Sequence, residues 1–377
     1  MKISRIIKIL KNNFTPLKNV ILFESIPDVS DNTKAVFDEM IKRELNRKYK
    51  LVWIVSGNSH RFKNYDNVFY LDENDPKQKR QIQKLMISAK CMICCNRFLP
   101  RMRWGQKTFY LSHGTTVKSV KSYYTIPDRI DYFIVTSENV MDLQSYELNF
   151  DKSRTIPLGF PRNDALTKSN LDVKGYLHTH CKKVIVWYPT FRQHKGGLKS
   201  ASDVTLPILH NEELAVELNK SAIENDVLIV LKPHFAQDVT YIKDMKLSNI
   251  RFIGEDFFEE NNICSYEFVA GCDALITDYS SIYFDYTLCN KPIAVIWEDI
   301  EEYSKNPGLI DNYEYYLRGA EKLYTLDDLK AFVARLADGT DLLKDERNSV
   351  MREVNISNDG KNSERVVNFI MDKLRIT

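Results

Sequence analysis

Short apolar segments alternate with segments of helical periodicity along most of this 377-residue chain. Apolar runs of four to eight residues are typical of buried strands, and apolar residues three or four positions apart are typical of amphipathic helices. Repeated alternation of the two predicts parallel sheets covered by helices. We expect strands at residues 20–24, 51–56, 68–71, 91–95, 108–111, 132–136, 184–188, 227–231, 250–253, 274–276 and 293–297. We expect helices at 34–45, 78–89, 138–148, 212–224 and 326–336, and a last helix that runs to residue 374.

The alternation stops between residues 166 and 182, where polar residues follow one another without clear periodicity. We interpret this stretch as a linker, because the chain is long enough for two domains of ordinary size. The prediction is an α/β protein with two Rossmann-like domains, residues 1–165 and 183–355, that face a cleft. Ligands of open α/β sheets bind outside the carboxyl ends of the strands, so such a cleft brings two ligands together. Residues 356–377 are expected to form a C-terminal helix that packs back on the N-terminal domain.

Composition and charge exclude several classes of protein. A content of 44% hydrophobic and 28% charged residues is that of a globular protein. A net charge of +2 argues against a general nucleic-acid binder, so we expect no nucleic-acid partner. Seven cysteines scattered through apolar runs are typical of reduced thiols in a cytosolic protein. Cys91, Cys94 and Cys95 have no second Cys or His pair at a matching distance, so we assign them to a buried strand and expect no metal there.

The first residues of the chain form a basic amphipathic pattern. Apolar residues recur at helical spacing between residues 3 and 10, and Lys and Arg residues surround them. A helix of this kind at residues 2–14 fits the surface of an anionic membrane, and it equally fits a surface helix packed on its own domain. No segment reaches the ~18 to 20 apolar residues of a transmembrane helix, and no signal peptide with a cleavage site is visible.

Residues 274–286 combine a strand, a polar turn and the start of a helix. The apolar run ends at Ile276, and apolar residues return at helical spacing from Ile282. The residues between them include four that cap helices: Thr277, Asp278, Ser280 and Ser281. The start of a helix presents unpaired backbone N–H groups and a positive dipole end, which together suit a phosphate. The alternative is an ordinary junction of strand, cap and helix.

A histidine follows the predicted strand 108–111. His113 precedes Gly114, so the imidazole is expected to be accessible at the strand end. Imidazole is the side chain that most readily takes and returns a proton near neutral pH, which suits a general base. The alternative is a histidine that only stabilises a turn.

Cationic residues follow two strands of the second half. Arg192 comes after strand 184–188, and its guanidinium has the geometry to hold a phosphate through two N–H groups. Lys232 and His234 follow strand 227–231, on either side of a proline. Together with Ser280 and Ser281, these residues predict an anion site at the strand ends of the second domain.

Taken in order, these residues resemble the CDP-glycerol glycerophosphotransferase family, which builds teichoic acids and related phosphopolymers. The likeness extends from about Ser112 to Arg365, and Asp278-Tyr279-Ser280-Ser281 is its most specific element. The matching motifs are His113-Gly114-Thr115 with Lys118, Gly159 to Asp164, Pro189-Thr190-Phe191-Arg192, Lys232-Pro233-His234, Leu275 to Ser281 with Phe284-Asp285, and Gly360 with Glu364-Arg365.

The resemblance implies a GT-B-like architecture, in which residues 1–165 bind the acceptor and face the membrane and residues 183–355 bind a CDP-alditol donor. It implies transfer of glycerol phosphate from CDP-glycerol to a hydroxyl of an undecaprenyl-diphosphate-linked saccharide, with release of CMP. Shorter members of the family include primases, and a length of 377 residues favours that type. The enzyme is then expected in the cytoplasm, peripheral on the inner face of the cell membrane, with residues 2–14 on the anionic surface.

The resemblance also suggests roles for single residues. The predicted catalytic residues are His113, as general base, and His234; the predicted donor-binding residues are Arg192, Lys232, Asp278, Ser280 and Ser281. Because a helix N-terminus and cationic side chains can neutralise a phosphate, we expect no obligatory metal or other cofactor.

Departures from the usual motifs keep other functions open. Ser112 stands where the family usually has Trp, and Thr116 stands where Pro is common. A CDP-ribitol-using or polymerising member of the same family is therefore an alternative. A GT-B enzyme that uses a nucleotide sugar is a second alternative, and a non-catalytic membrane-associated scaffold is a third.

Overall fold

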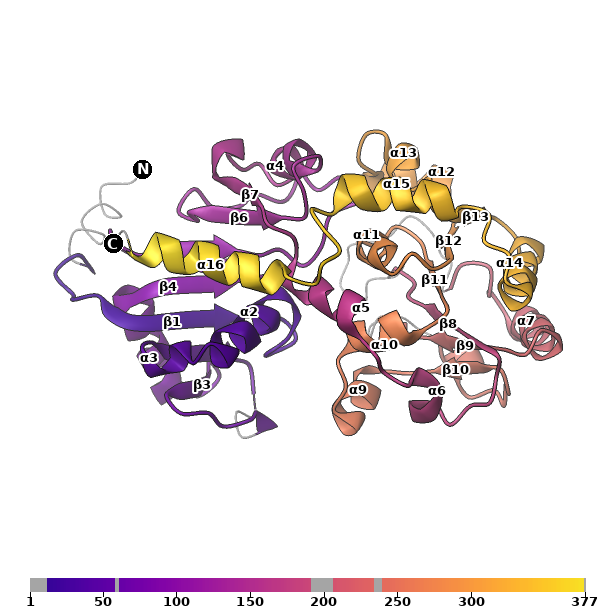
Figure 1. Ribbon diagram of the computed structural model, residues 1–377, viewed down its shortest axis with the longest axis horizontal. Coiled ribbons are helices and arrows are strands. Elements are labelled where there is room, and N and C mark those ends of the chain that lie inside the picture. The colour runs from indigo at the N-terminus through magenta and orange to yellow at the C-terminus, as the bar shows by residue number, and fades with distance from the viewer. Residues whose placement is uncertain (1–11, 58–60, 191–205, 234–238, 376–377) are drawn as a thin grey trace. The chain divides into compact units, whose positions relative to one another are not determined.

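Contacts within the chain divide it into two compact units. The computed structural model describes residues 12–57, 61–190, 206–233 and 239–375 (Figure 1). Unit 1 comprises Met1–Thr115, Tyr123–Asp164 and Ile356–Thr377, and unit 2 comprises Thr116–Ser122 and Ala165–Asn355. Within the described ranges each unit has one sheet, and all neighbouring strands in both sheets are parallel. This confirms the predicted class of two Rossmann-like α/β domains.

Unit 1 is built on a seven-stranded sheet of described residues, in the order β3-β2-β1-β4-β5-β6-β7. Its strands are β1 (Lys18–Glu24), β2 (Lys50–Val55), β3 (Val68–Asp72), β4 (Ala89–Cys94), β5 (Lys107–Tyr110), β6 (Tyr132–Val135) and β7 (Thr155–Pro157). Its helices are α2 (Asp31–Lys42), α3 (Pro76–Ser88), α4 (Met141–Glu147) and α16 (Asn362–Arg375), with 3₁₀ turns η1 (Leu45–Arg47), η3 (Lys152–Arg154) and η4 (Pro161–Asn163).

The central strands of unit 1 are buried on both faces, as expected of a parallel sheet covered by helices. Phe23 of β1 packs against Phe37 of α2 and Trp53 of β2, with ring centroids 5.6 and 5.2 Å apart. Cys91 and Cys95 belong to the same cluster of buried side chains. Burial raises the pKa of both thiols well above the ordinary value. These cysteines are therefore part of the apolar core.

The C-terminal helix α16 completes the core of unit 1 (Figure 1). Its buried apolar residues are Val366, Val367, Ile370 and Leu374. The helix contacts α2 and β5, and its first N–H groups are capped by Asp164, whose carboxylate oxygens lie 2.8 Å from the nitrogen of Asn362 and 2.9 Å from that of Ser363. Gly159 lies against this start, because a Cβ there would come within 2.1 Å of Asn362 Oδ1. The motif at residues 159–164 thus holds α16 in place.

Unit 2 contains a six-stranded sheet of described residues, in the order β10-β9-β8-β11-β12-β13. Its strands are β8 (Lys183–Trp187), β9 (Val227–Leu231), β10 (Ile250–Phe252), β11 (Ala274–Thr277), β12 (Ile293–Ile296) and β13 (Glu321–Leu323). Its longer helices are α7 (Glu212–Glu224), α14 (Leu326–Asp338) and α15 (Lys344–Val354). Its shorter helical segments are α6 (Val173–Tyr176), α8 (Thr240–Lys243), α9 (Glu255–Asn261), α10 (Ser265–Gly271), α11 (Ile282–Tyr286), η5 (Thr287–Cys289), α12 (Ile300–Tyr303), the π-helical turn η6 (Ser304–Gly308) and α13 (Tyr313–Tyr316).

The stretch at residues 166–182 differs from the expected linker. It folds with unit 2, where it forms α6 and most of α5 (Asp164–Lys168). Val173 and Leu177 are buried there. Both helices are little more than one turn long, so they contain too few residues to show a hydrophobic period.

Residues 116–122 also differ from the expected division. They come between β5 and β6 of unit 1 in sequence, yet they pack with unit 2, and we call them the strap. The N–H of Ile310 donates to the carbonyl of Val117 over 3.0 Å, and the N–H of Ser119 donates to the carbonyl of Gly308 over 3.1 Å. Backbone bonds of this kind leave no periodic side-chain pattern. The sequence therefore gave no sign that the chain leaves unit 1 shortly after His113.

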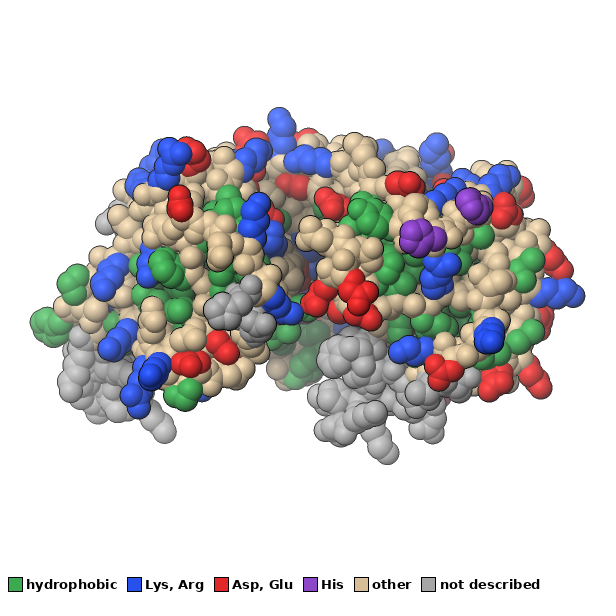
Figure 2. All heavy atoms as spheres, turned by 90° about the horizontal axis from the view of Figure 1, so that it is seen from below, with side chains coloured by type: hydrophobic (Ala, Val, Ile, Leu, Met, Phe, Trp, Pro, Cys, Tyr) green, Lys and Arg blue, Asp and Glu red, His purple; other side chains and the backbone are tan. Residues whose placement is uncertain are grey.

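The surface of the molecule carries mixed charge. Basic and acidic side chains are interspersed over the face shown in Figure 2, in keeping with 53 Lys and Arg residues against 51 Asp and Glu residues. Among the helices that the structure describes, none is long and apolar enough to cross a membrane.

Candidate active site

The polar residues singled out from the sequence follow the carboxyl ends of strands, where parallel sheets bind ligands. His113 follows β5 in unit 1. The residues that follow β9 and β11 in unit 2 are Lys232, Asp278, Ser280 and Ser281. Arg192 and His234 lie outside the described residues.

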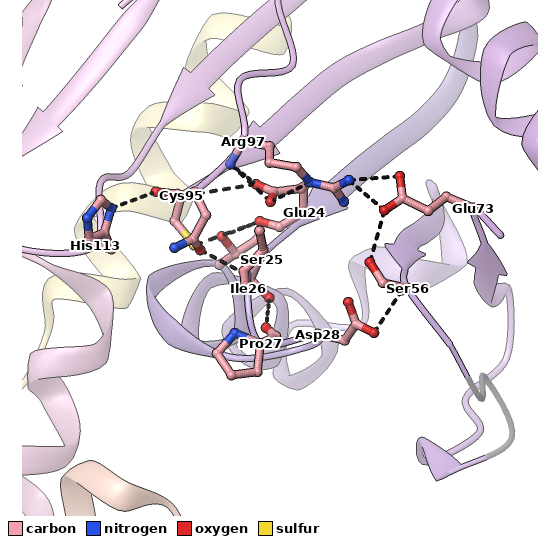
Figure 3. A network of polar contacts seen from close by, with 12 residues as sticks. Glu24, Ser25, Ile26, Pro27, Asp28, Ser56, Glu73, Cys95, Arg97 and His113 are labelled. Atoms are coloured by element: carbon pink, nitrogen blue, oxygen red, sulfur yellow. Dashed lines mark hydrogen bonds and ion pairs between the residues drawn. The ribbon is translucent and has the colours of Figure 1, made fainter. Parts of the chain in front are cut away.

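His113 stands on a sharply turned loop. Ser112 before it has a φ of +57°, Gly114 after it has a φ of +146°, and His113 itself is exposed. Its Nδ1 lies 3.4 Å from the carbonyl oxygen of Cys95, at the end of β4 (Figure 3). A carbonyl oxygen only accepts, so this contact favours the tautomer with hydrogen on Nδ1 and the lone pair on Nε2. In this form Nε2 is the ring nitrogen that can take a proton.

A buried carboxylate fixes the turn that carries this carbonyl. Glu24, the last residue of β1, is fully buried and accepts the N–H groups of Asn96 over 3.3 Å and of Arg97 over 3.0 Å. Arg97 Nη1 lies 2.6 Å from an oxygen of Glu73, which also accepts the hydroxyl of Ser56 over 2.9 Å (Figure 3). Burial raises the pKa of Glu24, although these N–H groups and the Arg97 charge oppose the rise. This network was not predicted, and its one signal in the sequence is a glutamate that ends an apolar strand.

Asp278 connects the ends of two neighbouring strands in unit 2. It follows β11 and is only 1% exposed. The N–H of Thr190, after β8, lies 3.0 and 2.9 Å from the two carboxylate oxygens, and the Thr190 hydroxyl donates to one of them. The N–H of Tyr279 donates to the same carboxylate over 2.7 Å. Asp278 is one of the predicted donor-binding residues, and these bonds show that its carboxylate also joins the ends of β8 and β11.

Ser280 and Ser281 are half-buried before α11. The apolar residues that return at helical spacing from Ile282 predict a helix there, but α11 contains only five residues and gives way to the 3₁₀ turn η5. A macrodipole is the sum of aligned peptide dipoles, so a helix of this length contributes little. An anion at this position would depend on the two hydroxyls and on neighbouring N–H groups rather than on a helix dipole.

Lys232 is engaged in an ion pair at the end of β9. Its Nζ lies 2.6 Å from Oε1 of Glu255, the first residue of α9, and 5.4 Å from the ring centre of Tyr188 at the end of β8. The Lys232 side chain is 18% exposed and that of Glu255 is 55% exposed. The positive charge therefore lies at the same sheet edge as Asp278, with a carboxylate beside it that the sequence analysis did not identify.

Each sheet edge carries its own polar groups. At the sheet edge of unit 1, the contact of His113 with the Cys95 carbonyl favours hydrogen on Nδ1. At the sheet edge of unit 2 stand the ammonium of Lys232 and the hydroxyls of Ser280 and Ser281. Within the part of the chain that the structure describes, no group of three or more His, Cys, Asp and Glu residues is arranged to hold a metal ion.

Solved structures with the same fold define the class of protein. The Wall Teichoic Acid Polymerase TagF superposes over 100% of this chain and 99% of that chain, with a TM-score of 0.74 at 20% identity. A co-structure of S. aureus MnaA with UDP gives a TM-score of 0.54 at 14% identity, over 95% of this chain and 97% of that one. The chain therefore has a GT-B-like fold.

Comparison with known sequences then identifies the family. The model of CDP-glycerol:poly(glycerophosphate) glycerophosphotransferase matches residues 9–372, so the chain belongs to this family of teichoic acid glycerophosphotransferases. The teichoic acid glycerol-phosphate primase of Bacillus subtilis (strain 168) is 24% identical over 306 residues, which cover 75% of each protein. The teichoic acid poly(glycerol phosphate) polymerase of Bacillus spizizenii is 26% identical over 334 residues, which cover 80% of this chain and 78% of that protein.

Proposed function

We propose that this protein transfers glycerol phosphate from CDP-glycerol to a hydroxyl of a lipid-linked saccharide and releases CMP. The observation that carries the proposal is the family match, which spans both units and includes the residues after β5, β9 and β11. Support for the donor comes from a solved structure of a TagF variant with CDPG, which shares the fold with a TM-score of 0.75.

In the proposed reaction the acceptor oxygen attacks the phosphorus nearest the glycerol, and the bond from that phosphorus to CMP breaks. Nε2 of His113 takes the hydroxyl proton, consistent with hydrogen on Nδ1. CMP leaves with the electron pair of the broken bond. The groups assigned to its negative charge are Lys232, His234, Ser280 and Ser281, with Arg192 as a clamp on the donor. Asp278 acts through Thr190, and turnover requires no resident metal ion or other cofactor.

The acceptor is proposed to be an undecaprenyl-diphosphate-linked saccharide at the inner face of the cell membrane, where the enzyme is peripheral. Of the proposed membrane segment 2–14, the structure describes the last three residues. Phe14 is 88% exposed, and Trp104 on the adjacent segment is 65% exposed. The N–H of Trp104 donates to the side chain of Asn13 over 2.9 Å, so the two segments lie together. Exposed aromatic residues beside basic ones are typical of a membrane interface. In the sequence, Arg103 directly precedes Trp104, and Lys18 follows Phe14.

A primase-type reaction, which adds one glycerol phosphate, is the preferred form. Its support is the share of each relative's length that the similarity covers. The match covers 75% of the B. subtilis primase but only 40% of the B. subtilis poly(glycerol phosphate) polymerase. The B. spizizenii polymerase is matched over 78% of its length, so the mass of the product has to decide the number of units added.

The test is CMP release from CDP-glycerol with a synthetic lipid-disaccharide acceptor, in the presence of a chelator, followed by mass spectrometry of the product. We expect one added glycerol phosphate, and a loss of about 100-fold or more in His113→Ala, as is usual for a general base. If His113→Ala retains turnover within about threefold of wild type, the base is another group.

The alternatives give different products in the same assay. CDP-ribitol in place of CDP-glycerol identifies a ribitol enzyme, and a ladder of masses identifies a polymerase. UDP released from UDP-sugars would establish a nucleotide-sugar enzyme. Absence of CMP release with every acceptor, in protein that binds membranes, would establish a scaffold.

A further inference from the structure

A buried asparagine in unit 1 bonds to the backbone of the His113 loop. Asn32 is fully buried near the start of α2. Its Nδ2 donates to the carbonyl of Ser112 over 2.9 Å and lies 3.4 Å from that of Leu111. Its Oδ1 accepts the N–H of Arg162 over 3.1 Å. One amide group thus joins the residue before His113 to the motif at residues 159–164, which is 130 positions away in sequence from Asn32.

The backbone on both sides of this contact is in an uncommon conformation. Ser112 has a φ of +57°, and on the other side Val29 and Asp31 have φ values of +54° and +58°. Residues other than glycine seldom adopt this region, least of all a β-branched one, and they keep it where surrounding contacts over-determine it. The ion pair between Asp31 and Arg162, with 2.7 Å between Oδ1 and Nη1, joins the start of α2 to the motif at residues 159–164, which Asn32 also contacts.

Only an amide satisfies all of these backbone groups at once. A buried carbonyl requires a donor and a buried N–H requires an acceptor, and both are costly to leave unpaired. Aspartate has the shape of asparagine but has no donor for Ser112, and an apolar residue offers neither group. The side chain of Asn32 is therefore matched to the position of the loop.

We propose that Asn32 is a positioning residue that holds the His113 loop so that Nδ1 faces the Cys95 carbonyl and Nε2 takes the proton. The inference rests on the proposed function for the role of His113 and goes beyond it in naming what places the imidazole. Without the amide, the loop relaxes away from a φ of +57° at Ser112, and the ring loses its contact with the Cys95 carbonyl, which favours hydrogen on Nδ1.

Two variants and one matched control test this. Asn32→Asp replaces the donor nitrogen by oxygen, and Asn32→Ala removes the amide without adding charge. The control is Gln106→Glu, at the opposite end of β5. Gln106 is also a buried amide: its Nε2 donates to the carbonyls of Met86 and Ala89 over 2.8 Å each, and its Oε1 accepts the N–H of Met102 over 2.8 Å.

CMP release is measured with CDP-glycerol and a soluble acceptor, and each rate is divided by the fraction of protein that binds CMP in calorimetric titration. We expect both Asn32 variants to lose about 10- to 100-fold in kcat, as for a catalytic group displaced by about 1 Å, with KM for CDP-glycerol within about threefold of wild type. Gln106→Glu is expected to lower the thermal stability about as much as the Asn32 variants do, and to keep kcat within about threefold of wild type. In the His113→Ala background, Asn32→Ala changes the residual rate by less than about threefold.

Nitrogen-15 NMR of the His113 ring gives a readout that does not depend on turnover. We expect the Nδ1–H tautomer in wild type and in Gln106→Glu, and the Nε2–H tautomer in Asn32→Ala. An unchanged tautomer in both Asn32 variants, or an equal loss of kcat with and without His113, would overturn the inference. Failure of the proposed function looks different, because His113→Ala would then turn over near the wild-type rate whatever the tautomer.

Discussion

At the scale of single residues, the charged side chains of Asp278 and Lys232, which follow strands of the unit 2 sheet, have partners within the protein. The carboxylate of Asp278 is surrounded by donors from Thr190 and Tyr279, and the ammonium of Lys232 is paired with Glu255. A charge that is already paired with a protein group attracts a ligand less strongly than an unpaired one. Glu255 therefore competes with any anion that Lys232 binds.

Removal of this competitor should strengthen donor binding. We expect Glu255→Gln to lower the Kd for CDP-glycerol by up to about fivefold, because partly exposed ion pairs contribute about 0.2–1 kcal/mol. Lys232→Met should raise the Kd, and the gain from Glu255→Gln should vanish in the double variant. Calorimetric titration measures all four proteins. A Kd that rises in Glu255→Gln would show that Glu255 supports the donor site.

At the scale of elements, the sequence predicts long amphipathic elements and misses those that are very short or mostly polar. The 14-residue helix α16 has clear amphipathic periodicity, and its apolar face lies in the core of unit 1. The strand β13 has only three residues, and α15 is so polar that its buried side includes Arg347, which pairs with Asp341. Neither element was predicted, because hydrophobic periodicity needs several apolar residues in one window.

The contribution of α16 to unit 1 can be measured directly. Ile370 is fully buried, and truncation of a buried isoleucine to alanine costs about 2–5 kcal/mol. We expect Ile370→Ala to lower the free energy of unfolding by that amount in urea, followed by circular dichroism. Asp372→Ala, on the exposed side of the same helix, should change it by less than about 0.5 kcal/mol. Equal effects of the two substitutions would mean that α16 does not stabilise unit 1.

At the scale of the whole molecule, chain segments cross between the units. The strap folds with unit 2 between two strands of unit 1, and α16 returns to unit 1 after α15 of unit 2. Both His113, the proposed base, and the proposed membrane contact belong to unit 1. Membrane binding and donor binding are therefore expected to be separable by mutation.

Trp104 tests the membrane proposal. Burial of a large aromatic side chain contributes on the order of 1.5–3 kcal/mol, so Trp104→Ser should weaken binding to vesicles of anionic phospholipid by about tenfold or more. Turnover of a soluble acceptor should stay unchanged. Tyr324→Ser, which removes an exposed aromatic residue of unit 2, is the control. Sedimentation with vesicles measures the effect, and equal binding by wild type and Trp104→Ser would contradict the proposal.

The sequence alone determined the class of fold and the family. Long strands and helices can be predicted from the sequence because burial of one face imposes a period on their apolar residues. The motifs at strand ends can be recognised because their residues are neighbours in sequence. Tertiary structure decided the partners of those motifs. Asp278 accepts a hydrogen bond from Thr190, 88 positions away in sequence, and Asn32 donates one to Ser112, 80 positions away. No local periodicity of the sequence encodes such pairs. The short helix α11, the strap and the Glu255 carboxylate were likewise set by packing, because each depends on groups brought together only when the strands align.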